Sequence, residues 1–112
     1  SPSDGVRVLV DRLWPRGVKK SSAHLDHWMK DVAPSTSLRS WFGHKPERFA
    51  EFSKRYKKEL SGNAELAELR KLGRSARVTL LYGARDPEVN HAVVLQSVLR
   101  RTGRAKPAKK AA

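Results

Sequence analysis

The stretch VRVLV, residues 6–10, decides the fold because it predicts a short buried strand near the start of the chain. It runs directly into DRLWPRG, residues 11–17, which puts Asp11, Arg12, Trp14 and Arg16 into one turn. Surface turns are usually built from Gly, Asn, Asp, Ser or Pro, not from two arginines and a tryptophan. The composition of this turn therefore indicates a binding site at the end of the strand.

A second strand is predicted by RVTLLYGA, residues 77–84. The segment DPEVNHAVVLQSVLRR, residues 86–101, predicts a long helix directly after it, with Asp86 as N-cap and Pro87 at its first position. A strand followed by a helical region, a second strand and a helix is the rhythm of an α/β protein. The fold class expected is therefore α/β, a small parallel sheet covered by helices with Rossmann-like layering.

Four helices are predicted between the two strands. The first begins near Ser22, and its apolar stripe consists of Leu25, Trp28, Met29 and Val32. Ser35 is the expected N-cap of a short second helix that Gly43 closes, and Pro46 opens the third. The fourth helix carries Leu66, Leu69 and Leu72 and is expected to end at Gly73.

The chain of 112 residues has the length of one domain, expected over residues 1–102, with a basic and disordered tail over 103–112. Two strands make a thin sheet. Either a further strand precedes Ser1, or a partner completes the sheet edge, for which a homodimer is one arrangement.

Composition excludes several classes of function. The chain has no cysteine, which excludes disulfides, thiolate nucleophiles and cysteine-based metal sites. No apolar run approaches the roughly 18 residues of a membrane span, so the expected location is the cytoplasm. The net charge is +13, and residues 100–112 contain six basic residues and no acid. Such a tail attracts polyanions without reading their sequence.

The two charged turns should meet, because parallel strands end at the same edge of a sheet, where α/β proteins bind ligands. Arginine suits phosphate and carboxylate groups, and the start of the last helix also favours anions. The sequence therefore predicts an anion site. The candidate acid and base groups are Asp11, Asp86 and His91, and the candidate ligand-binding residues are Arg12, Trp14, Arg16, Ser35 and Asn90.

Each candidate also has a structural interpretation. Asp86 and Ser35 fit helix caps, Trp14 fits a core residue over the end of the sheet, and His91 could bond the neighbouring loop. His27 and Asp31 would stand one helical turn apart near His24, but no further ligand is in view, so no metal site is predicted. No phosphate-binding or dinucleotide-binding motif is present, and the sequence names no cofactor.

Four blocks of the chain resemble the YeaO-like family of bacterial proteins, whose function is unknown. They are RVLVDRLWPRG, LDHWMKDVAPS, LRSWFGHKPERFAEFSKRYKKEL and VTLLYGARDPEVNHAVVL, in this order, and the resemblance spans residues 6 to about 99. The resemblance implies a compact α/β domain that usually begins with one more strand. It also implies signature positions at 11–17, 33–35, Asp86, Asn90, His91 and Ala92. It implies no activity, and the basic tail departs from the family pattern.

Two functions remain open, with a protein-interaction module as a third. The first is binding of a small anionic ligand at the sheet edge, in an enzyme or a binding protein; it requires Arg12 or Arg16 to point into a cleft. The alternative is nucleic-acid binding through the phosphate backbone, which predicts a steep salt dependence. Its candidate contacts are Lys19, Lys20, Lys54, Lys57, Lys58, Arg100, Arg101, Arg104, Lys106, Lys109 and Lys110.

Overall fold

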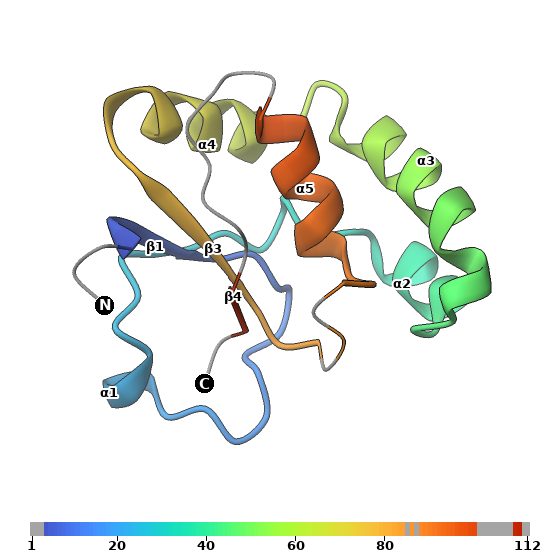
Figure 1. The fold of residues 1–112 in the computed structure, drawn as a ribbon, viewed down its shortest axis with the longest axis horizontal. Coiled ribbons are helices and arrows are strands. Elements are labelled where there is room, and N and C mark those ends of the chain that lie inside the picture. Colours follow the sequence, from blue (N-terminus) through green and yellow to red (C-terminus); the bar gives the residue numbers. More distant parts are fainter. Residues whose placement is uncertain (1–3, 85, 87, 101–108, 111–112) are drawn as a thin grey trace.

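The computed structural model describes residues 4–84, 86, 88–100 and 109–110. A small parallel sheet lies at its centre, with strand order β2-β1-β3-β4 (Figure 1). The strands are β1 (Val6–Leu9), β2 (His27–Trp28), β3 (Val78–Tyr82) and β4 (Lys109–Lys110). β1 and β3 pair in parallel from Val6 opposite Val78 to Leu9 opposite Leu81, which confirms the prediction of two parallel strands in an α/β fold.

The helices are α1 (Lys20–Ala23), α2 (Thr36–Phe42), α3 (Phe49–Leu60), α4 (Ala64–Ser75) and α5 (His91–Leu99), with a 3₁₀ turn at Pro46–Arg48 before α3. α2, α3 and α5 lie together on one side of the picture in Figure 1, while α1 lies apart from them. No helix in the described ranges is long and apolar enough to cross a membrane.

The two faces of the sheet are covered differently. On one face, alternate strand residues such as Val8 and Leu80 join a large core with the buried side chains of α2, α3, α4 and α5. On the other face, Leu9 and Leu81 pack under Trp14, Leu25 and Trp28, which come from the segment after β1. This alternation is the two-residue period of a strand buried on both faces. Helices therefore form the main core, and the segment between β1 and α2, with β2 in it, closes the opposite face.

Three helices start at the caps that their sequences provide. Ser35 Oγ accepts a hydrogen bond from Leu38 N at 3.2 Å, which confirms Ser35 as the N-cap of α2. Asn63 Oδ1 accepts from Leu66 N at 2.9 Å at the start of α4, and Asn90 Oδ1 accepts from Val93 N at 3.0 Å at the start of α5. Such caps satisfy backbone N–H groups that have no partner inside the helix.

The helix predicted from Ser22 through Val32 is wrong. α1 ends at Ala23, and the chain then forms the edge strand β2, with Asp26 N donating to Arg7 O at 2.9 Å and Met29 N to Leu9 O at 2.8 Å. Trp28 packs on one face of the sheet, whereas Met29 belongs to the core on the other face. Pairing with β1 therefore overrides the helical spacing of the apolar residues, since adjacent residues of a strand point to opposite faces.

Three helix boundaries also differ from prediction. Pro46 opens a 3₁₀ turn, Pro46–Arg48, and α3 itself begins at Phe49. Asp86 is not the N-cap of α5: its carboxylate accepts from Glu88 N at 2.8 Å and Val89 N at 3.1 Å in a turn, and the helix begins at His91, capped by Asn90. Pro87 lies outside the described residues. α4 continues past Gly73 to Ser75, because Gly73 keeps helical geometry instead of ending the helix.

The expected tail, residues 103–112, lies outside the described residues except for Lys109 and Lys110. Lys109 and Lys110 form β4 beside Leu81 and Tyr82, at the carboxyl end of β3. A division at residue 102 between domain and disordered tail stays a prediction.

Gly5 is required where the chain enters β1. Its φ is +66°, and a Cβ placed there would lie 2.3 Å from Arg77 O, the carbonyl that accepts from Val6 N. Gly62 also has a positive φ, +75°, but open space around it. We expect Gly62→Ala to cost about 1–2 kcal/mol, the usual cost of that backbone region, and Gly5→Ala to cost at least twice as much in urea unfolding. Equal losses would contradict the close approach at Gly5.

Candidate functional site

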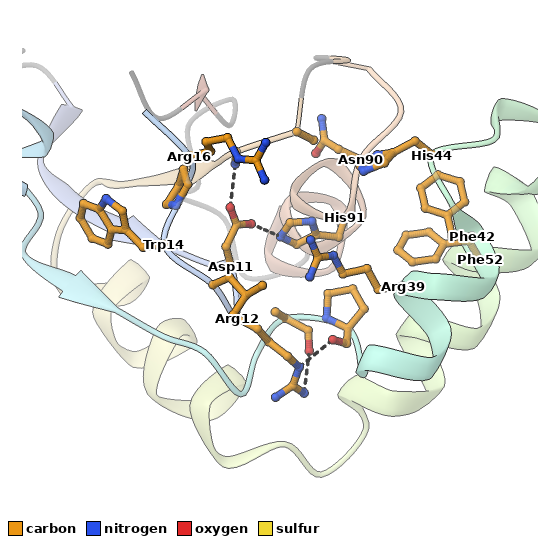
Figure 2. Close-up of a pocket in the computed structure, with 16 residues that line it drawn as sticks. Asp11, Arg12, Trp14, Arg16, Arg39, Phe42, His44, Phe52, Asn90 and His91 are labelled. Carbon is orange, nitrogen blue, oxygen red and sulfur yellow. Dashed lines mark hydrogen bonds and ion pairs between the residues drawn. The ribbon is translucent and has the colours of Figure 1, made fainter. Parts of the chain in front are cut away.

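A pocket of about 320 Å³ opens at the carboxyl end of the sheet, where the two charged turns come together (Figure 2). The turn after β1 and the loop after β3 form one side, and α2 and α3 form the other. The lining residues are Asp11, Arg12, Leu13, Trp14, Pro15, Arg16, Ala33, Pro34, Arg39, Phe42, His44, Phe52, Gly83, Ala84, Asn90 and His91.

Asp11 links three elements at the centre of this pocket. One carboxylate oxygen, Oδ2, accepts from Gly83 N at 2.7 Å, and Oδ1 lies 2.9 Å from His91 Nε2. The same His91 nitrogen is 2.8 Å from Val10 O. Since a carbonyl oxygen can only accept, Nε2 carries the proton and shares it between Val10 and Asp11. Both oxygens of Asp11 are therefore held by the protein.

Gly83 allows this arrangement because it has no side chain. A Cβ at this position would lie 3.0 Å from Asp11 Oδ2 and 3.1 Å from Pro15 Cβ. The end of β3 can therefore approach the turn after β1 closely enough to donate its N–H to Asp11. A larger residue would push the two turns apart.

Tyr56 supports His91 from the core. The two rings meet edge to face with centroids 6.3 Å apart, and Tyr56 Oη donates to Val32 O at 2.6 Å. Burial raises the pKa of the Tyr56 hydroxyl, and the neighbouring Glu59 and Asp11 charges raise it further. The hydroxyl therefore stays protonated and fixed, so it serves as a support and not as a base.

Arg12 is engaged by the loop before α2. Its Nε donates to Pro34 O at 2.8 Å and its Nη2 to Ala33 O at 3.4 Å, while Nη1 lies 3.8 Å from Asp31 Oδ1. All three guanidinium nitrogens thus face the protein. The geometry gives Arg12 the role of tying the Ala33–Pro34 loop to the turn after β1.

Arg16 and Arg39 are placed differently. Both are exposed, both line the pocket, and Figure 2 shows both side chains directed toward the space beside His91. Within the described part of the chain, neither guanidinium forms an ion pair or hydrogen bond. Anion binding at the sheet edge requires Arg12 or Arg16 to point into a cleft, and Arg16 has this placement. Arg39 was missed, although its spacing of three residues from Phe42 puts both on one face of α2.

The other predicted site residues have structural partners. Asn90 lines the pocket, but its Nδ2 donates to Asp86 O at 2.7 Å and its Oδ1 caps α5. Trp14 also lines it, donating from Nε1 to Val18 O at 2.5 Å and meeting Trp28 edge to face at 5.3 Å. Ser35 and Asp86 do not line the pocket. Ser35 donates from Oγ to Glu59 Oε2 at 2.5 Å and caps α2.

The basic residues of the alternative function lie elsewhere. Lys19, Lys20 and Arg100 are exposed, as are Lys54, Lys57 and Lys58 on α3. Lys109 and Lys110 form β4, and Arg101, Arg104 and Lys106 lie outside the described residues. His27 sits in β2, so it no longer stands one helical turn from Asp31. The described residues hold no group of three side chains suited to a metal ion.

A family model described as DUF488-N3i, the inactive DUF488-N3 subclade, matches residues 1–111. The chain belongs to this family. An uncharacterised protein of Mycobacterium tuberculosis is 51% identical over 98 residues, 88% of this chain and 83% of that protein. The uncharacterised protein YeaO of Escherichia coli is 43% identical over 99 residues, 88% of this chain and 86% of YeaO. The resemblance to YeaO-like proteins is thereby confirmed. No solved structure matches the chain significantly.

The contrast between Arg12 and Arg16 can be measured as stability. Arg12→Lys keeps the charge but removes the planar fork that contacts two successive carbonyls, so we expect a loss of about 1–2 kcal/mol in urea unfolding. Arg16→Lys is the matched control and should change stability by less than about 0.5 kcal/mol. If Arg12→Lys leaves the free energy of unfolding unchanged, the loop holds its position without the guanidinium.

Proposed function

We propose that this DUF488-N3i protein binds a small phosphate- or carboxylate-bearing ligand in the pocket at the carboxyl end of the sheet. One observation carries the proposal: two exposed arginines, Arg16 and Arg39, point into the same pocket without an acidic partner in the described residues. An arginine fork pairs readily with two oxygens of a phosphate or carboxylate.

The local charge favours an anion despite the presence of Asp11. Its two oxygens already accept hydrogen bonds from Gly83 N and His91 Nε2, so its charge is partly compensated. His91 is also the first residue of α5, and the start of a helix carries partial positive charge. The pocket therefore combines two cations that have no partner among the described residues with one carboxylate whose oxygens are already hydrogen-bonded.

Binding without turnover is the form of the proposal that the observations support best. The family model is described as an inactive subclade, and the chain has no cysteine to act as a nucleophile. Asp11 and His91 hold each other and the ends of β1 and β3, a role that positions the pocket. We therefore assign them to maintaining the site and the arginines to contacting the ligand.

Thermal shift with inorganic phosphate tests this function. At ten times the dissociation constant, phosphate should raise the melting temperature of the wild type by about 5 °C. Arg16→Ala and Arg39→Ala should each reduce the shift to near zero. Arg74→Ala removes the same charge from an exposed position on α4 outside the pocket, and its shift should match the wild type. Equal shifts in all four proteins would contradict a pocket site.

Nucleic-acid binding is a second candidate, favoured by the exposed face of α3. Lys54, Lys57 and Lys58 stand at the i, i+3 and i+4 positions there. The carboxylate of the adjacent Glu59 is hydrogen-bonded to Ser35: the Ser35 backbone N–H donates to it at 2.9 Å and the Ser35 hydroxyl at 2.5 Å. Glu59, the carboxylate in the last turn of α3, is therefore already hydrogen-bonded. The three lysines form a basic face beside it.

Replacing Lys54, Lys57 and Lys58 together by Gln tests that face. If it contacts phosphates, binding of a short single-stranded RNA should weaken, and the slope of log affinity against log salt should fall by about 0.7 per lost contact. Fluorescence anisotropy at several salt concentrations measures both quantities. Arg39→Ala serves as the comparison, since it alters the pocket and leaves α3 intact. An unchanged slope in the triple variant would refute the basic face.

A further inference from the structure

We propose that the occupant of the pocket is an organic anion with a ring-sized apolar body, and not an inorganic anion. This inference rests on the proposed function, because the same pocket and the same arginines are involved. It adds the chemical class of the ligand, which the arginines alone leave open.

The size of the pocket is the first reason. A water molecule takes up about 30 Å³ in the liquid, and an inorganic phosphate occupies the space of only a few waters. The pocket volume is about 320 Å³, within the range of small-molecule sites, roughly 300–1,000 Å³. A phosphate held by Arg16 and Arg39 would leave most of this space unfilled.

The chemistry of the remaining wall is the second reason. Beyond the arginines, the lining includes carbon from Phe42 and Phe52 of α2 and α3 and from Ala33 and Pro34 of the loop before α2, which are buried and reach the pocket only by small exposed edges. Water in contact with such a wall gains few hydrogen bonds, so an apolar group that displaces it binds favourably. An anion without an apolar body would leave this part of the pocket hydrated.

The apolar wall is rigid before any ligand binds. The rings of Phe42 and Phe52 stack with centroids 4.2 Å apart and an interplanar angle of 19°, and His44 approaches Phe42 at 6.1 Å. Phe52 in turn packs against Tyr56 at 5.7 Å. A wall fixed in this way needs no ordering when the ligand arrives, which favours affinity.

One helix, α2, supplies both an anion-binding residue and an apolar residue to the pocket. Arg39 and Phe42 are three residues apart on the same helix, and Figure 2 shows the Arg39 guanidinium and the Phe42 ring facing the same pocket. A ligand that presents its anionic group to Arg39 therefore brings the adjoining part of its body toward Phe42.

Leu13 adds an exposed apolar surface to the same pocket. It is 64% exposed, and it is the one large hydrophobic residue that the described chain leaves exposed. A ligand body long enough to fill the pocket would cover part of this side chain. A bound ligand of this kind would account for the exposure of Leu13.

Two pairs of probes test the class of ligand by isothermal titration calorimetry. Methyl phosphate and benzyl phosphate share one anionic group and differ in the body, as do acetate and phenylacetate. We expect the ring-bearing member of at least one pair to bind wild type at least tenfold more tightly. Benzyl alcohol, which has the ring without the anion, should bind more weakly than that member.

Two kinds of variant separate the anionic and apolar contacts. Arg39→Ala should weaken both members of a pair by a similar factor, leaving their affinity ratio unchanged. Phe42→Leu and Leu13→Ser should lower that ratio at least threefold while leaving the small anion's affinity nearly unchanged. Leu13→Ser alters no core contact, so it remains informative if Phe42→Leu weakens the fold.

The outcomes distinguish this inference from the function on which it rests. Arginine-dependent binding of methyl phosphate or acetate without any preference for the ring would overturn the inference and leave the anion site intact. Absence of binding by all four anions would overturn both. A ring preference that persists undiminished in Leu13→Ser and Phe42→Leu would place the apolar body outside this pocket and also overturn the inference.

Discussion

The carboxylate of Asp11 is the constraint on which the carboxyl end of the sheet depends. It joins the end of β1 to Gly83 after β3 and to His91 at the start of α5. Gly83 and His91 are each more than seventy residues from Asp11 in the sequence, so no local preference could bring them to it. Because His91 Nε2 also donates to Val10 O, the start of α5 is held against the end of β1. The pocket exists because these three ends are fixed.

The arginines around this constraint divide into two kinds. Arg12 donates to two successive carbonyls and serves the fold, whereas Arg16 and Arg39 stay exposed and face the pocket. A guanidinium bonded to backbone oxygens offers few donors to a ligand, while an exposed one without a partner in the described residues keeps its donors available. The presence of an arginine thus does not by itself indicate a ligand site. The hydrogen-bond partners of its guanidinium decide whether it can contact a ligand.

The site could be predicted from the sequence in part. The meeting of the two turns followed from parallel strand ends, and Asp11, Arg16 and His91 all line the pocket. Arg39 and the wall of Phe42 and Phe52 were not anticipated, because they come from helices whose docking angle is set by the core. The helix expected across Trp28 and Met29 failed for a related reason: a strand partner, β1, was available in space and satisfied the backbone better.

The sequence by itself determined the elements with strong local signals. Apolar runs specified β1 and β3, Ser35 specified the start of α2, and the absence of cysteine excluded thiol chemistry. Each of these depends on residues within a few positions of one another. The tertiary structure alone decided that Arg12 would bond Pro34 O, 22 residues away, and that Arg39 would reach a pocket formed by two distant turns. The physical reason is that side-chain hydrogen bonds and pocket walls depend on distance in space, which local sequence preferences do not encode.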